Sequence, residues 1–333
     1  MIERNYRLDN VKYLLILFVV FGHLVEPLIN QSAVFKVLWA SIYSFHMPAF
    51  ALISGVLSKP ELSSSDIGKS IRTILIPFIA FTVLYEAYNL IESGHISGYS
   101  KKLQPYWILW FLYSLFIWRL MLPVLLKFRF PILLTVLVAV ASGYFNSINY
   151  FLGVSRTLYF LPFFLIGYKL APKILMPVSL TLPFKSILLA ILIGNVLLFI
   201  VFNDASHEWM YGSYSFKRLG VHGWSAGGIR LALMTTSVLT ILSILFLMPD
   251  KKIWCSERGR HSMHVYAWHG FLIKLFLTFG VITFIGKSSL IMALFILFVM
   301  SFIITYLLSS NFVSDVTQRY VLEPFQKFFI YKV

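Results

Sequence analysis

The sequence predicts an all-α polytopic membrane protein with about ten transmembrane helices. Of the 333 residues, 59% are hydrophobic and only 12% are charged, whereas soluble domains carry roughly 45–50% apolar and about 25% charged residues. The apolar residues form continuous runs without the period-two alternation of barrel strands. This amount of apolar surface exceeds what one water-facing domain can bury, so we expect the helices to face lipid.

The charge distribution argues against a nucleic-acid-binding protein. The chain has 28 Lys and Arg against 13 Asp and Glu, a net charge of +15, but the basic residues stand singly between apolar runs and form no stripe or arm. Cys255 is the single cysteine, which excludes an internal disulfide and a thiolate metal cluster. We therefore expect a lipid bilayer as the surrounding phase and no nucleic acid as a partner.

The N-terminal segment predicts a retained helix and not a cleaved signal peptide. Arg4, Arg7 and Lys12 precede an apolar run that continues to about Leu28. No small-x-small cleavage site follows that run.

Runs of about 17–25 apolar residues, separated by Gly, Pro and charged residues, define the expected spans. We place them at 12–28, 35–57, 73–91, 107–126, 131–149, 156–171, 185–202, 228–248, 262–284 and 288–310. The segment 156–171 is short and contains Pro162 and Gly167, which predicts a tilted or broken helix.

Loop charge predicts that both termini lie in the cytoplasm. With this orientation, 19 of the 28 basic residues fall on the inner side: Arg4, Arg7, Lys12, Lys59, Lys69, Arg72, Arg119, Lys127, Arg129, Lys169, Lys173, Lys185, Lys251, Lys252, Arg258, Arg260, Arg319, Lys327 and Lys332. This bias satisfies the positive-inside rule. We expect a membrane domain at 1–310 and a cytoplasmic tail at 311–333, whose mixed aromatic and basic residues suit the inner membrane surface.

Polar residues within the spans are the candidate functional residues, because they are costly in a membrane. His23 lies eleven residues into the first expected span, and Glu26 follows three positions later on the same helical face. His46, followed by Met47 and Pro48, lies near the middle of the second span. A helix broken at Pro48 would leave backbone carbonyls free beside His46. Because the connection 29–34 is short, we expect the two spans to be antiparallel neighbours and their histidines to face one cavity.

Several interpretations of these histidines remain open. A single intramembrane histidine is often a satisfied packing residue, and His and Glu within spans also mark proton-relay transporters. Zinc is disfavoured, because His23 and His46 are not a helix-spaced pair and no cysteine assists. The residues thus leave an enzyme, a transporter of polysaccharide or small solute, and a non-catalytic subunit as alternatives.

Two early blocks of the sequence combine polar residues with apolar runs. The first is LDNVKYLLILFVVFGH at 8–23, with Asp9, Lys12 and His23, and the second is SFHMPAFALISG at 44–55, with His46. These blocks resemble the membrane-bound acyltransferase-3 family, closest to its fucose 4-O-acetylase branch, which has an Asp, a basic residue and a histidine at the positions of Asp9, Lys12 and His23. Weaker matches follow in order at 72–78, 110–116, 155–168 and 262–269, the last ending on His269. Many members have Arg where this chain has Lys12, which lacks the bidentate fork of a guanidinium.

The resemblance implies transfer of an acyl group, usually acetyl, from cytoplasmic acyl-CoA to a sugar hydroxyl of an envelope or exported polysaccharide or its lipid-linked precursor. A neutral imidazole suits this chemistry, because the attacking alcohol must lose a proton. We assign His23 as general base or transient acyl carrier, Glu26 as the residue that orients it, and His46 as a partner that binds the carbonyl or shares the proton. The expected location is the plasma or inner membrane.

Cations at the inner ends of the first spans are the expected acetyl-CoA contacts, namely Lys12, Lys59 and Arg72, with Lys69 nearby. Each of them also suits a simple topology anchor. On the outer side Glu86, Arg156 and Arg230 lie near span ends, and the loop 203–227 with His207 and several aromatic residues suits either a sugar-binding lid or an ordinary polar loop. No metal is expected, and the oligomeric state is left open.

Overall fold

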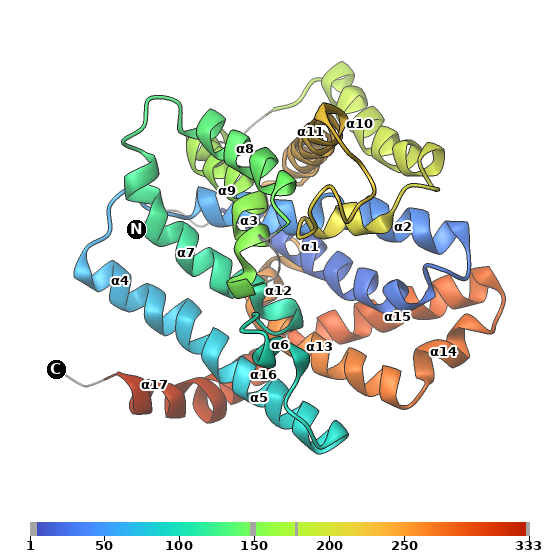
Figure 1. Ribbon diagram of the computed structural model, residues 1–333. Helices are drawn as coiled ribbons and strands as arrows, with labels where there is room; N and C mark the ends of the chain where they lie inside the picture. Colours follow the sequence, from blue (N-terminus) through green and yellow to red (C-terminus); the bar gives the residue numbers. More distant parts are fainter. Residues whose placement is uncertain (1–4, 147–150, 177–178, 331–333) are drawn as a thin grey trace. The chain divides into compact units, whose positions relative to one another are not determined.

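The computed structural model describes residues 5–146, 151–176 and 179–330, and every regular element in these ranges is helical (Figure 1). The α-helices are α1 Tyr6–Val25, α2 Ala33–Tyr43, α3 His46–Val56, α4 Ser64–Ser70, α5 Ile76–Ser93, α6 Gly98–Lys101, α7 Trp110–Leu125, α8 Pro131–Ala141, α9 Val154–Leu175, α10 Leu182–Val201, α11 Trp224–Leu247, α12 Ser256–Gly259, α13 Ser262–Thr278, α14 Val281–Gly286, α15 Leu290–Leu308, α16 Asn311–Val316 and α17 Glu323–Phe329. Short 3-10 or π turns extend several of them. Arg4, Lys332 and the end of the expected span 131–149 lie outside the described residues.

The prediction of an all-α polytopic membrane protein is confirmed. In the described part of the chain, eight helical segments are long and apolar enough to cross a membrane: Tyr6–Leu28, Ala33–Val56, Ser64–Ser93, Trp107–Leu125, Phe151–Leu175, Leu182–Val201, Trp224–Leu247 and Leu290–Leu308. Each corresponds to one of the expected spans. The helix Phe151–Leu175 runs through Pro162 and Gly167 without a break.

Two of the ten expected spans take another form. The segment expected at 131–149 contains a shorter apolar helix, Pro131–Tyr144. The segment expected at 262–284 is divided into α13 and α14, because Gly280 between them adopts a left-handed conformation with φ of 69°. Glycine reaches this region without steric cost and ends helices there.

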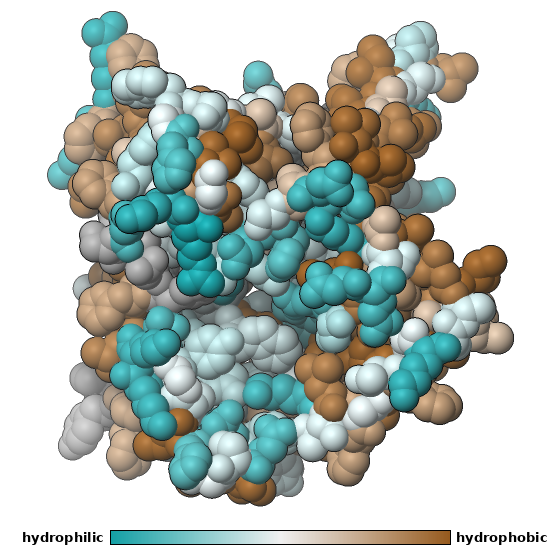
Figure 2. Space-filling view, turned by 45° about the vertical axis from the view of Figure 1, so that its right-hand side comes forward, coloured by the Kyte–Doolittle hydropathy of each residue, from teal (hydrophilic) through white to brown (hydrophobic). Residues whose placement is uncertain are grey.

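Apolar side chains lie on the molecular surface, as expected for helices in contact with lipid. Figure 2 shows such apolar patches on the face in view. The helices α10 and α15 bury only a minority of their side chains, although both consist almost entirely of apolar residues.

The chain forms two compact units by its internal contacts. The first contains Met1–Phe50, Ala171–Met210 and Ala232–Ser314, and the second contains Ala51–Leu170, Tyr211–Leu231 and Asp315–Val333. In the first unit, α1 is the central helix and packs against α2, α12, α13 and α15, while α10 packs against α2. Fifteen of the 20 residues of α1 are buried. The polar side chains of this helix can therefore form hydrogen bonds with neighbouring protein segments.

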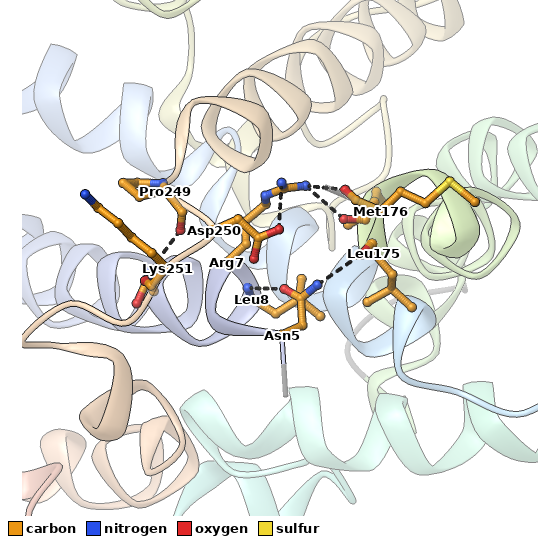
Figure 3. Close-up of polar contacts among 10 residues, drawn as sticks. Asn5, Arg7, Leu8, Leu175, Met176, Pro249, Asp250 and Lys251 are labelled. Atoms are coloured by element: carbon orange, nitrogen blue, oxygen red, sulfur yellow. Dashed lines mark hydrogen bonds and ion pairs between the residues drawn. The ribbon is translucent and has the colours of Figure 1, made fainter. Parts of the chain in front are cut away.

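Polar contacts fasten the start of α1 to two other segments of the first unit (Figure 3). The Arg7 guanidinium donates to the carbonyls of Ile174 and Met176, each at 3.1 Å, and pairs with Asp250 at 3.0 Å. The side chain of Asn10 donates to the carbonyls of Pro249 and Lys251. Arg7 thus satisfies carbonyls at the end of α9 that have no partner within that helix.

In the second unit, glycines allow close helix packing. A Cβ atom on Gly55 would lie 1.8 Å from the carbonyl oxygen of Phe164, and one on Gly167 would lie 1.9 Å from that of Leu52. The last turns of α3 therefore approach α9 at backbone distance, as small residues permit in membrane helices. The π-helical turn Ile71–Leu75 joins α4 to α5 and packs against α7.

Candidate active site

A histidine, a carboxylate and a phenol meet at the end of α1. His23 Nδ1 lies 2.9 Å from Glu26 Oε2 and 2.8 Å from the Tyr43 hydroxyl, which in turn donates to Glu26 Oε2 at 2.9 Å. His23 is in the last turn of α1, Glu26 opens the following 3-10 turn, and Tyr43 ends α2. The three-residue spacing on one helical face makes this contact possible, and the structure shows the hydrogen bond between His23 and Glu26.

These contacts determine which nitrogen of His23 is basic. An ionised carboxylate only accepts hydrogen bonds, so we assign the proton of the neutral imidazole to Nδ1, which donates to Glu26. The lone pair then resides on Nε2, and a carboxylate at Nδ1 stabilises the imidazolium that forms when Nε2 takes a proton.

The second expected span breaks immediately before His46 and not at Pro48. Residues Ser44 and Phe45 form a turn between α2 and α3, and Pro48 lies in the first turn of α3, where its missing N–H is tolerated. The missing N–H nevertheless leaves the Ser44 carbonyl without its usual helical partner, as the sequence indicated. His46 Nδ1 is 2.9 Å from the Ile42 carbonyl, so His46 donates from Nδ1 and also carries its lone pair on Nε2.

Two polar residues from other helices satisfy the carbonyls at this break. Asn195 donates to the Ser41 carbonyl at 3.2 Å and accepts from the Ser44 hydroxyl at 3.1 Å. The Ser237 hydroxyl donates to the Ser44 carbonyl at 2.5 Å. Asn195 belongs to α10, which is largely exposed and apolar, and is one of the few buried residues of that helix. Unpaired carbonyls at membrane depth are costly, so Asn195 and Ser237 hold the turn that positions His46.

Tyr43 joins the two predicted histidines. Its ring makes edge-to-face contacts with His23 and with His46, at centroid distances of 5.6 and 4.6 Å, and it stacks on Trp39 at 4.0 Å. A Cβ atom on Gly22 would lie 2.9 Å from Tyr43 Cε2. The absence of a side chain at Gly22 therefore allows the Tyr43 ring to pack directly against α1. The prediction that His23 and His46 face a common region is consistent with this shared neighbour.

His269 is a third histidine of this group, to which the sequence argument gave no role. Its ring centroid lies 5.5 Å from that of His23, and its Nδ1 is 2.9 Å from the Val265 carbonyl. A carbonyl accepts, so the lone pair of His269 is again on Nε2, and this buried atom has no hydrogen-bond partner among the described residues. Leaving a buried hydrogen-bond acceptor unsatisfied lowers the free energy of unfolding by about 1–3 kcal/mol. Its position within an expected span was the available signal, the same that marked His46. We call His23, Glu26, Tyr43, His46 and His269 the histidine cluster.

The cluster is partly exposed. The side chains of His23 and Glu26 keep exposures of 12% and 23%, whereas His46 and His269 are fully or almost fully buried. His207, from the long loop expected to cover the site, makes an edge-to-face contact with Trp39 at 5.7 Å. Trp39 therefore links this loop to Tyr43.

The residues expected to contact acetyl-CoA are divided between the two units. Lys12, in the first unit with the cluster, pairs with Asp9 at 2.7 Å and stays partly exposed. Lys59 and Arg72 belong to the second unit. Lys59 is largely exposed and pairs with Asp66 at 2.9 Å, and Arg72 is exposed in the π-helical turn.

Two of the expected outer-side residues have local structural partners. Glu86 accepts hydrogen bonds from the backbone N–H and hydroxyl of Ser97 and from the Ser100 hydroxyl. Arg230 is buried and donates to the carbonyls of Ala139 and Tyr214 at 3.0 Å. These contacts hold the loops at the ends of α5 and α8. Among the described residues, no group of three His, Cys, Asp or Glu is arranged to hold a metal ion.

Comparison with known proteins places the chain in a family. Residues 5–310 match the acyltransferase-3 family, described as an acyltransferase domain. Nodulation protein NolL of Sinorhizobium fredii is 33% identical over 125 residues, 32% of this chain and 34% of that protein. Nodulation protein NolL of Mesorhizobium japonicum is 27% identical over 191 residues, 52% of this chain and 49% of that protein. The matches thus span at most about half of these relatives' length. No solved structure matches the chain. The family match covers nearly all of the sequence, and the chain belongs to the acyltransferase-3 family of membrane proteins.

Proposed function

We propose that this protein is an integral membrane O-acyltransferase that transfers acetyl from acetyl-CoA to a sugar hydroxyl of an envelope or exported polysaccharide, or of its lipid-linked precursor. The observation that carries the proposal is the contact of His23 Nδ1 with Glu26 and Tyr43 on membrane-spanning helices. This arrangement supplies a basic nitrogen of defined tautomer where an alcohol can be deprotonated. The family match supports the acyl-transfer chemistry.

In the proposed reaction, His23 Nε2 takes the proton of the acceptor hydroxyl while its oxygen attacks the thioester carbonyl. The new carbon–oxygen bond forms, the carbon–sulfur bond breaks, and the departing thiolate takes the proton back from the imidazolium. The products are the O-acetyl ester and free CoA. Glu26 stabilises the imidazolium through Nδ1, and Tyr43 holds the carboxylate in place through its own hydrogen bond.

The tautomer of His46 favours one of its two expected roles. Because its Nδ1–H is bound to the Ile42 carbonyl, the neutral ring presents an acceptor at Nε2. An acceptor does not bind the carbonyl oxygen of a thioester. We therefore assign His46 to sharing the proton.

We propose that Lys12, Lys59 and Arg72 contact the phosphates of acetyl-CoA from the cytoplasmic side. Cations and phosphates form charge-assisted hydrogen bonds, and all three side chains retain some exposure. Contact with cytoplasmic acetyl-CoA requires these cations to face the cytoplasm, and we propose that both termini lie on that side. The membrane is proposed to be the plasma or inner membrane. In the segment 311–333, proposed to lie on the inner surface, Tyr320 and Phe328 are exposed.

Tags test this orientation. Tags on both termini should be protected from protease in intact cells, and a tag inserted at Gly212 should be cleaved. Protection of the Gly212 tag together with cleavage of the terminal tags would show the opposite orientation.

Reconstitution of the purified protein with radiolabelled acetyl-CoA and fractionated envelope glycan tests the activity. We expect label in the glycan that mild alkali releases as acetate. A transporter would instead move labelled solute into vesicles without forming an ester, and that result would contradict the proposal.

A further inference from the structure

Three exposed aromatic rings lie together at the end of α15 in the first unit. Trp254 is 62% exposed and Tyr306 42%, and Phe302 is exposed between them. The Phe302 ring stacks on Tyr306 at a centroid distance of 6.2 Å and lies 5.9 Å from the ring of Trp254. Trp254 also packs edge-to-face against the buried Tyr13 of α1 at 5.2 Å, which holds the indole in place. We call Trp254, Phe302 and Tyr306 the α15 aromatic surface.

Arg258 places a positive charge on this surface. Its guanidinium carbon lies 3.4 Å from the centre of the Tyr306 ring. Its Nη1 donates to the Tyr306 carbonyl at 2.5 Å and lies 3.5 Å from the Ser309 hydroxyl. These partners are all uncharged, and within the described part of the chain no carboxylate pairs with Arg258. A guanidinium has five N–H donors, and the side chain is partly exposed, so donors remain for an external anion.

The acidic residues beside this surface already have basic partners. Glu257 lies 3.4 Å from Lys252 and 3.6 Å from Arg260 and is shared between them. Asp250 pairs with Arg7. The segment 250–260 therefore presents an excess of positive charge next to Arg258, and such a field attracts an anionic ligand.

The α15 aromatic surface lies where a candidate membrane span ends. α15 ends at Leu308, and the polar residues Ser309, Ser310 and Asn311 follow it. Trp, Tyr and basic side chains are typical of the boundary between membrane and water. The remainder of α15 is apolar and buries only a minority of its side chains. An apolar chain that starts at Phe302 can therefore continue along this helix into the bilayer.

We propose that Arg258 and the α15 aromatic surface bind an anionic phospholipid. Its phosphate accepts hydrogen bonds from the free donors of Arg258, and an acyl chain lies against Phe302. Hydrogen bonds between guanidinium and phosphate are charge-assisted, and basic sites on membrane helices bind anionic headgroups. The apolar continuation along α15 favours a lipid over a soluble phosphate compound such as CoA. This site goes beyond the proposed function and does not depend on it.

Fluorescence of Trp254 tests the site directly, because bromine atoms on an acyl chain quench a tryptophan that they contact. The full-length protein is reconstituted in phosphatidylcholine vesicles that contain increasing fractions of brominated phosphatidylglycerol or brominated phosphatidylcholine. The signal of Trp254 is the difference between the parent protein and Trp254→Phe. We expect phosphatidylglycerol to bind at least about fivefold more tightly than phosphatidylcholine. Equal quenching by the two lipids would overturn the inference.

Variants of Arg258 test the origin of this preference. Arg258→Gln should abolish it, and Arg258→Lys should retain part of it, because the ammonium keeps the charge but loses the planar fork. Arg129 also lies over an exposed aromatic ring, at 5.1 Å from Phe130, so Arg129→Gln is the matched control and should keep the parental preference. Persistence of the preference in Arg258→Gln, or its loss in Arg129→Gln, would contradict the assignment to Arg258. If Arg258→Gln does not fold, the parental preference and Arg258→Lys decide.

Two further results would assign the surface to another occupant. Relief of the quenching by millimolar CoA or glycerol 3-phosphate would show a site for a soluble phosphate compound and would overturn the lipid assignment. Absence of quenching of Trp254 by either brominated lipid would show that protein, such as a second copy of this chain, covers the surface. We expect neither, and both measurements are independent of acetyl transfer.

Discussion

His23 Nδ1 lies 2.9 Å from Glu26 Oε2 across the junction between α1 and the 3-10 turn that follows it. The contact fixes the imidazole tautomer and places a negative charge next to the ring that would become an imidazolium in the proposed proton transfer. The same carboxylate oxygen accepts from Tyr43. The two residues are the proposed base and its orienting group, and they lie within one short stretch of the first candidate membrane span.

Removing the charge of Glu26 should slow the reaction without preventing substrate binding. In Glu26→Gln the side chain still forms hydrogen bonds but no longer stabilises the imidazolium, so we expect kcat to fall roughly tenfold, less than on loss of the base itself. Tyr43→Phe removes one hydrogen bond and should cost about fivefold. Acetyl transfer at saturating acetyl-CoA measures both. Full activity of Glu26→Gln would contradict its orienting role.

A methyl group on Gly22 should disturb the site while improving the helix. Alanine is favoured over glycine in helix interiors by about 1 kcal/mol, but its Cβ would lie 2.9 Å from Tyr43 Cε2. We expect Gly22→Ala to lower kcat several-fold, because the displaced ring carries the hydroxyl that contacts His23 and Glu26. Gly194→Ala, with open space around its Cβ position, is the control and should retain wild-type activity. Equal activity of the two variants would show that the ring tolerates displacement.

The ion pair between Arg7 and Asp250 should be important for stability. Arg7 is buried, and removal of its carboxylate partner leaves the guanidinium with only the carbonyls of Ile174 and Met176 to offset its buried charge, which is destabilising. We expect Asp250→Asn to lower the thermal unfolding midpoint in detergent clearly. Lys59→Met breaks an exposed pair and should leave the midpoint nearly unchanged. Similar shifts of the unfolding midpoint in the two variants would contradict the role of Arg7 as the anchor of α1.

Lys12 should contribute to the affinity for the acyl donor. If its ammonium contacts a phosphate, Lys12→Ala should raise the dissociation constant for CoA several-fold, and Lys12→Arg should retain binding because the guanidinium keeps the charge. Binding of CoA to the detergent-solubilised protein, measured by calorimetry, separates these outcomes. Equal affinity of Lys12→Ala and the parent would leave Lys12 as a partner of Asp9 alone.

The part of the site that depends on local spacing could be predicted from the sequence. His23 and Glu26 are three residues apart on one helix, so their contact follows from helix geometry. The break next to His46 was also indicated, since Pro48 removes one N–H. The break lies four residues earlier, at Ser44, because the carbonyl that loses its partner is the one four positions before the proline.

The part that depends on remote packing could not be predicted. Asn195 and Ser237 reach the same break from α10 and α11, and no local pattern relates them to His46. His269 joins His23 only because α13 packs beside α1. The division of the expected span 262–284 depends on Gly280, whose left-handed conformation is not apparent from an apolar run.

The rate of acetyl transfer by a His23 variant tests the central claim most directly. His23→Gln removes the basic nitrogen without placing a charge in the membrane, so the protein should insert and unfold as the parent does. With radiolabelled acetyl-CoA and envelope glycan, we expect the rate to fall at least about 100-fold, the lower limit for loss of a general base, while His95→Gln keeps the parental rate. A correctly inserted His23→Gln protein that acetylates glycan at the parental rate would contradict the account.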